Sequence, residues 1–252
     1  MTYLLYDTTF EGFLTAVFEV YEYKLEKVAI RKKTLEIPLL FGEIIDVKTN
    51  PDKAKRVTLK LIAIFEKQGF QSLLKTLLSE MDTIEDSLLE VIRYGLKTRN
   101  NILNDFGYPA VLEMKQVLKK IGREQHRMHA FVRFKLANDG IYYAFIEPDF
   151  DVVALISSHF RSRYADQQWL IYDLRRNKGI FYNLKNVQIV QLENDTKNAA
   201  EELTINLDSS EIEFQKLWKS YFKSTNIPSR KNMKLHLQNV PKRYWKYLIE
   251  KN

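Results

Sequence analysis

Polar side chains that could take part in catalysis concentrate between residues 123 and 181. Three of the four histidines, His126, His129 and His159, fall in this stretch, and Asp149 and Asp151 stand together in the sequence EPDFD. Imidazole and carboxylate groups can activate water by general acid–base catalysis, for example beside a flipped nucleobase. We therefore take these five residues as candidate catalytic residues. The alternative for the aspartates is structural, because Asp commonly caps the start of a helix. We expect at least one of them to cap the helix at 152–165.

A metal site is a weaker interpretation of the same side chains. His126 and His129 are three residues apart, so they converge on a helix but diverge on a strand. No HExxH motif is present, and the eight glycines form neither a Walker sequence nor a GxGxxG loop. We therefore expect no bound metal and no other cofactor.

Basic side chains in the same stretch and near the C-terminus are suited to phosphate, because guanidinium groups match phosphate oxygens in shape and charge. The candidate nucleic-acid contacts are Arg127, Arg133, Arg161, Arg163, Arg175, Arg176, Arg230, Lys231, Arg243 and Lys246. The arginines near the acids could instead form a structural network with Asp149, Asp151 or Asp166. In residues 243–247 cations alternate with aromatic rings, which suits base stacking. The alternative is that Tyr244, Trp245 and Leu248 close the core as a C-terminal latch.

The positive charge of the chain is concentrated at its C-terminal end. The 252 residues include 39 Lys and Arg against 32 Asp and Glu, a formal net charge of +7. Residues 216–252 hold ten cations and one acid, Glu250, so this tail carries +9 and the preceding residues sum to −2. Such asymmetry indicates an anionic partner, of which nucleic acid is the commonest.

The composition excludes several classes of protein. The chain has no cysteine, and so it can hold no disulfide, thiolate zinc site, thiol nucleophile or cysteine-ligated iron–sulfur cluster. No apolar run reaches the ~18 residues that a membrane span needs. We therefore expect a cytoplasmic protein without a membrane partner.

Hydrophobic spacing predicts a mainly helical region over residues 1–121, with short strands at 2–6, 28–30 and 44–47. Helices are expected from residue 8, from residue 51, and over 70–79, 83–97 and 108–121, the last ended by Gly122. The expected helix starts are Thr8 with Glu11, Asn50 with Pro51, and Asp82 with Glu85.

The pattern changes to alternation over residues 122–252. Residues 129–136 and 141–147 flank an Asp-Gly turn, and residues 169–174 and 180–184 flank a second turn, so each pair predicts a β-hairpin. A strand is expected at 187–192, a loop at 193–208, and helices at 152–165, after Asp208, at 228–237 and at 241–249. The expected fold class is α+β, with a helical N-terminal half followed by antiparallel hairpins flanked by helices. The two regions could also form one continuous domain.

Three blocks of sequence carry a resemblance that covers almost the whole chain. They are HRMHAFVRFKLANDGIYYAFIEPDFD, HFRSRYADQQWLIYDLRRNKGIFY and LWKSYFKSTNIPSRKNMKLHLQNVPKRYWKYL, and FEGFLTAVFEVYE near the N-terminus fits as well. The chain resembles a bacterial family that is described as a domain of unknown function and associated with DNA metabolism or DNA repair. The resemblance implies a radical-SAM protein as partner. In other bacteria a similar domain is fused to a uracil-DNA-glycosylase-like domain.

The missing cysteines restrict what that resemblance implies. Radical-SAM enzymes and cluster-bearing uracil glycosylases both need cysteine ligands, so this chain can only be a partner of such enzymes. The expected function is that of a DNA-binding accessory protein for a radical-SAM enzyme. The alternative is a hydrolase or glycosylase that acts on a damaged nucleobase through the histidines and aspartates named above.

Overall fold

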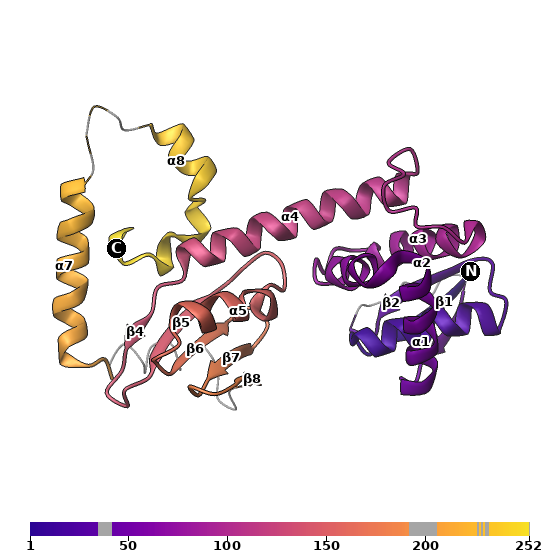
Figure 1. Cartoon of the computed structure of the whole chain (residues 1–252), viewed down its shortest axis with the longest axis horizontal. Helices are drawn as coiled ribbons and strands as arrows, with labels where there is room; N and C mark the ends of the chain where they lie inside the picture. The colour runs from indigo at the N-terminus through magenta and orange to yellow at the C-terminus, as the bar shows by residue number, and fades with distance from the viewer. Residues whose placement is uncertain (35–41, 192–205, 226, 228, 230–231, 252) are drawn as a thin grey trace. The chain divides into compact units, whose positions relative to one another are not determined.

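The computed structural model describes residues 1–34, 42–191, 206–225, 227, 229 and 232–251 (Figure 1). The chain divides into two compact units, Met1–Gly122 and Arg123–Asn252. Each unit combines helices with a sheet, so the expected α+β class is confirmed. The expected loop at 193–208 and the start of the expected helix at 228–237 lie largely outside the described residues.

Unit 1 is a small parallel sheet with helices. Its elements are β1 (Thr2–Tyr6), α1 (Phe10–Glu22), β2 (Val28–Lys32), β3 (Glu43–Asp46), α2 (Pro51–Leu77), α3 (Ile84–Thr98) and the first part of α4 (Pro109–Phe131). β1 lies between β2 and β3 and is parallel to both. The expected strands are therefore confirmed, and α1 connects β1 to β2 as a βαβ unit, which the hydrophobic spacing did not predict.

The expected helix starts are confirmed only in part. Asn50 caps α2, since its side chain accepts hydrogen bonds from two backbone N–H groups, and Pro51 is the first helical residue. The capping box at Thr8 is wrong by one residue, because Thr9 accepts the Gly12 N–H at 2.9 Å. The capping box at Asp82 is wrong as well: the carboxylate of Glu85 is buried and accepts the Tyr6 hydroxyl instead.

Helix α4 does not end at Gly122 but continues to Phe131. Its buried positions recur every three or four residues through Met114, Val117, Ile121, Glu124 and Met128. The helical periodicity of buried residues therefore continues past Gly122. The sequence pattern did not indicate this, because one of the buried positions, Glu124, is acidic and not apolar. The expected strand at 129–136 is correspondingly wrong except for its last two residues.

Unit 2 is built on a five-stranded sheet in the order β4-β5-β6-β7-β8. Its elements after α4 are β4 (Lys135–Leu136), β5 (Tyr142–Ile146), α5 (Val153–Arg163), β6 (Trp169–Asp173), β7 (Lys178–Tyr182), β8 (Val187–Val190), α7 (Ser209–Thr225), α8 (Met233–Asn239), η2 (Lys242–Tyr247) and η3 (Ile249–Lys251). Both expected hairpins are confirmed, as β4–β5 and β6–β7. The parallel pair β5–β6, connected through α5, is a second βαβ unit.

The core of unit 2 centres on β6, whose five residues are all buried. Trp169 and Tyr172 are completely inaccessible, and Ile156 and Phe160 of α5 are buried as well. Burying side chains of this size removes a large apolar area from water, which is the dominant stabilising contribution.

Two helical glycines, one in α3 and one in α4, offer a test of the packing. A Cβ on Gly95 of α3 would lie 2.2 Å from the Phe65 ring of α2, whereas a Cβ on Gly122 would meet nothing within 4 Å. We expect Gly95→Ala to lower the free energy of unfolding by ~1–3 kcal/mol through overpacking. Gly122→Ala should raise it by ~0.5–1 kcal/mol, because alanine restricts the unfolded chain. Urea denaturation measures both; a stabilised Gly95→Ala variant would contradict the described contact between α2 and α3.

Candidate nucleic-acid interface

The structure brings two of the candidate histidines into direct contact. The rings of His129, on α4, and His159, on α5, stack with centroids 4.0 Å apart and planes inclined by 15°. His126 lies one turn before His129 on α4 and is exposed. The Nε2 atom of His129 is buried and has no hydrogen-bond partner among the described residues.

The protonation state of His129 follows from these surroundings. Burial lowers the pKa of His129 below its usual value of 6.5, and the neighbouring His159 and His126 lower it further. A neutral imidazole is therefore the resting form at neutral pH, which also removes the repulsion between two stacked cations.

The candidate aspartates are each held by a cation. Asp149 pairs with Arg243 at 2.7 Å, and Asp151 pairs with Lys178. Neither caps α5: the N-cap is Val152, without a side-chain hydrogen bond, so the expected capping is wrong. Within the described ranges, no group of three or more histidines and carboxylates is arranged to hold a metal ion. The candidate catalytic set is thus a histidine pair and two separately neutralised acids.

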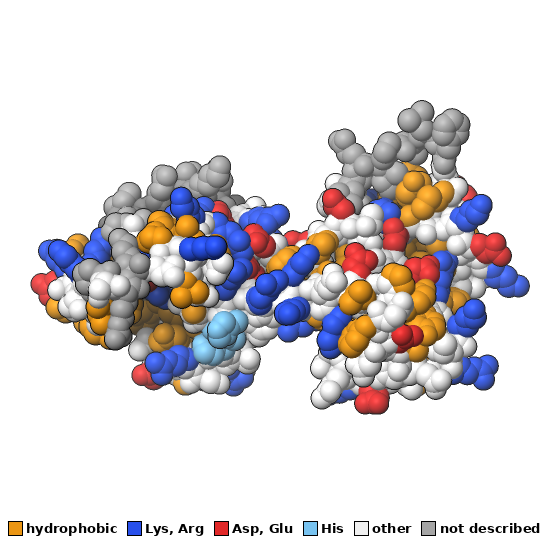
Figure 2. Space-filling model, turned by 90° about the horizontal axis from the view of Figure 1, so that it is seen from above, with side chains coloured by type: hydrophobic (Ala, Val, Ile, Leu, Met, Phe, Trp, Pro, Cys, Tyr) orange, Lys and Arg blue, Asp and Glu red, His pale blue; other side chains and the backbone are white. Residues whose placement is uncertain are grey.

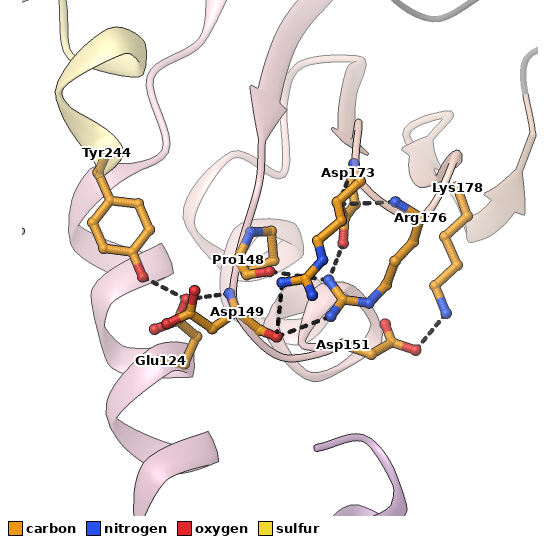
Figure 3. Close-up of polar contacts among 9 residues, drawn as sticks. Glu124, Pro148, Asp149, Asp151, Asp173, Arg176, Lys178 and Tyr244 are labelled. Carbon is orange, nitrogen blue, oxygen red and sulfur yellow. Dashed lines mark hydrogen bonds and ion pairs between the residues drawn. The ribbon is translucent and has the colours of Figure 1, made fainter. Parts of the chain in front are cut away.

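Glu124 of α4 is the centre of a polar network that the sequence reasoning missed (Figure 3). Its side chain is 1% exposed, and it accepts the Tyr244 hydroxyl and the backbone N–H of Asp149, the latter at 2.8 Å. Arg243 lies 3.1 Å and Arg127 3.6 Å from its second oxygen. A buried carboxylate is tolerated only when hydrogen-bond donors and opposite charges compensate its lost hydration. Glu124 has three donors and an ion pair with Arg127.

A second network fixes the loop at residues 147–151 from the other side (Figure 3). Asp173, at the end of β6, is fully buried and pairs with Arg176 at 2.8 Å. Burial raises the pKa of Asp173, and the Arg176 guanidinium opposes that shift. Arg176 also donates to the backbone carbonyls of Pro148 and Asp149, and Arg175 donates to the latter at 3.5 Å.

Most of the arginines proposed for phosphate contact are therefore engaged with the protein itself. Those that pair with carboxylates or donate to backbone carbonyls are Arg127, Arg133, Arg161, Arg175, Arg176 and Arg243. Lys246 pairs with Glu147. Arg163 is exposed at the end of α5, and Arg230 and Lys231 lie outside the described residues.

The aromatic residues of the tail form the expected latch in part. Tyr244 and Leu248 are buried at 2% and 1% exposure. Trp245 is half-buried, with its indole N–H donated to the Val240 carbonyl. These rings are thus occupied by packing, so the sequence 243–247 is not an open stacking surface.

Helix α7 carries exposed cations, unlike the paired arginines described above. Lys216, Lys219 and Lys223 recur at the spacing of one helix face and are exposed, and no ion-pair partner for them is found among the described residues. Phe214 and Tyr221 are 61% and 60% exposed on another face. In Figure 2, hydrophobic side chains lie exposed next to Lys and Arg side chains on the part of the surface that also carries the histidines.

Comparison with known proteins gives one family. The model of a domain of unknown function, DUF4130, matches residues 82–250, which is more than half of the chain. The protein belongs to the DUF4130 family. The DUF4130 region includes every candidate site residue named above. Among curated proteins none matches the chain. No helix in the described part of the chain is long and apolar enough to cross a bilayer.

The expected membership of a family of unknown function is thereby confirmed. The association with DNA repair and the radical-SAM partner are not addressed by the DUF4130 match and stay predictions.

The Glu124 network predicts an unequal response to two similar substitutions. Tyr244→Phe should lower the free energy of unfolding by ~1–3 kcal/mol, because it removes a donor from a buried carboxylate. Tyr143→Phe is the matched control: its hydroxyl donates to Asp139, which is exposed, so the loss should stay below ~1 kcal/mol. Urea denaturation of both variants provides the measurement, and equal losses would show that Glu124 does not depend on Tyr244.

The histidine pair predicts a pH dependence. Because the pKa of His129 is lower in the folded than in the unfolded protein, the unfolded state binds protons more readily, and the free energy of unfolding falls as the pH drops below about 6.5. His129→Phe should lose less stability than the wild type between pH ~7.5 and ~5.5. Denaturation at the two pH values tests this, and an NMR titration that places His129 at or above its ordinary pKa would contradict it.

Proposed function

We propose that this DUF4130 protein is a nucleic-acid-binding accessory protein in DNA metabolism or repair, acting beside a radical-SAM enzyme. The observation that carries the binding role is a row of exposed lysines on α7, Lys216, Lys219 and Lys223, which have no ion-pair partner among the described residues. Unpaired cations are available to replace the counterions of a phosphate backbone, whereas cations already neutralised by carboxylates are not. The partner enzyme is proposed from the family resemblance alone.

The contacts of the acids favour this role over the alternative of a hydrolase or glycosylase. A general base must lie within hydrogen-bond reach of the proton that it abstracts, and a neighbouring cation makes a carboxylate a weaker base. Asp149 and Asp151 are instead bound to Arg243 and Lys178. The two aspartates therefore hold the loop at 147–151 in place, and neither stacked histidine has a hydrogen bond to a carboxylate among the described residues.

The lysine row predicts a specific salt dependence. We expect the protein to bind a short labelled single-stranded oligonucleotide, and binding should weaken steeply between about 50 and 200 mM salt. Replacing Lys216, Lys219 and Lys223 together by alanine should reduce the slope of log K against log salt by about 2, since each phosphate contact contributes ~0.7 for single strands. Fluorescence anisotropy at several salt concentrations measures the slope.

A matched control changes the same charge elsewhere. Lys48, Lys55 and Lys67 are exposed in unit 1 and have no ion-pair partner among the described residues. Their triple alanine variant should keep the wild-type slope. Absence of binding at low salt, or equal slopes for the two triple variants, would refute the proposed role of α7.

A further inference from the structure

A groove in unit 2 lies between α7 and the strands and helix end that face it. Its volume is about 760 Å³, within the range of sites for small organic groups. Six aromatic side chains line it: Phe134, Tyr142, Tyr164, Phe214, Trp218 and Tyr221. Neither the lysine row nor the Glu124 network uses this groove.

One wall of the groove is fixed by packing. The Phe134 ring lies edge-on to the Phe160 ring at 5.7 Å and to the Tyr164 ring at 5.2 Å, and it is tilted against Trp169 at 6.1 Å. Phe160 and Trp169 belong to the buried core. The rings on this side therefore have defined orientations before any ligand is bound.

The opposite wall is the aromatic face of α7. Trp218 on this face donates its indole N–H to Glu250 at 2.9 Å, and Glu250 pairs with Arg133 at 2.8 Å. The Arg133 guanidinium lies 5.7 Å from the centre of the Trp218 ring. These contacts orient Trp218. Phe214 and Tyr221 are mostly exposed, and the Tyr221 ring lies 5.9 Å from the Trp218 ring, tilted by 34°.

The groove also carries polar groups that suit the edge of a base. The Gln167 amide lines it and forms no hydrogen bond within the described residues, so it can offer both a donor and an acceptor. Glu211 is already used, since it accepts from the Leu136 N–H and from the Gln215 amide.

A cation borders one of the lining residues. Arg163 precedes Tyr164 in the sequence, is exposed, and is not paired with an acid in the described part of the chain. A planar ligand that carries phosphate on its outer side would be complementary to this combination of rings and charges.

We propose that this groove holds an unpaired nucleobase of a single-stranded nucleic acid. The inference rests on the proposed nucleic-acid binding and adds to it a base-stacking site that is distinct from the lysine face of α7. Six rings around one groove favour a flat aromatic ligand over an aliphatic helix, because stacked or edge-on rings gain from a planar partner.

The test compares two ligands with equal phosphate charge. A short oligothymidylate should bind about tenfold more tightly than an abasic oligonucleotide of the same length, since stacking of one base contributes about that factor. Phe214→Ala and Tyr221→Ala should each remove most of this difference and leave the affinity for the abasic strand unchanged. Ile212→Ala, which alters an exposed α7 side chain outside the groove lining, should retain the full difference.

Trp218 supplies a second measurement that does not depend on alanine variants. Stacking of a base should quench tryptophan fluorescence when oligothymidylate is added, and Trp218→Phe should lose the quenching while still binding the strand.

Three results would overturn the inference. Equal affinity for the two strands would eliminate the base site while leaving the electrostatic binding intact. Failure of both strands to bind would refute the proposed function as well. A preference for oligothymidylate that survives in both Phe214→Ala and Tyr221→Ala would place the base elsewhere.

Discussion

The buried carboxylate of Glu124 is the interaction on which the arrangement of unit 2 depends. An ion inside a protein costs several kcal/mol unless donors and opposite charges replace its water, and the partners of Glu124 come from three separate parts of the chain. The donors are the Tyr244 hydroxyl, the backbone N–H of Asp149 and the Arg243 guanidinium, and Arg127 adds an ion pair. One charge on α4 therefore holds the loop at 147–151 and η2 together.

That requirement separates the basic residues into two groups. Arg243, although it lies in the strongly cationic tail, serves the interior by neutralising Glu124 and Asp149. Lys216, Lys219 and Lys223 are exposed and have no acidic partner among the described residues. The tail's net charge of +9 thus overstates the number of cations available to a ligand, since Arg243 is already paired with acids.

Local features of the chain were predictable, and long-range pairings were not. The Asp-Gly turn between β4 and β5 and the Asn50 cap of α2 depend on neighbouring residues alone, so their sequence signals sufficed. The burial of Glu124 was not predicted, because an acidic residue at a buried position interrupts the hydrophobic pattern of the helix. The partners of Asp149, which are Glu124 and Arg243, lie 25 residues or more away along the chain, and only folding brings such groups together.

The residue at which the DUF4130 match starts is not a suitable place to truncate the protein. Residue 82 precedes α3, but α3 is joined to the earlier strands by the Tyr6–Glu85 hydrogen bond and the Arg31–Asp86 ion pair. Its Gly95 also faces the buried Phe65 ring. A fragment that began at residue 82 would lose these partners and expose an apolar helix face to water, which favours aggregation. The region matched by the family model therefore does not coincide with a compact unit of this chain.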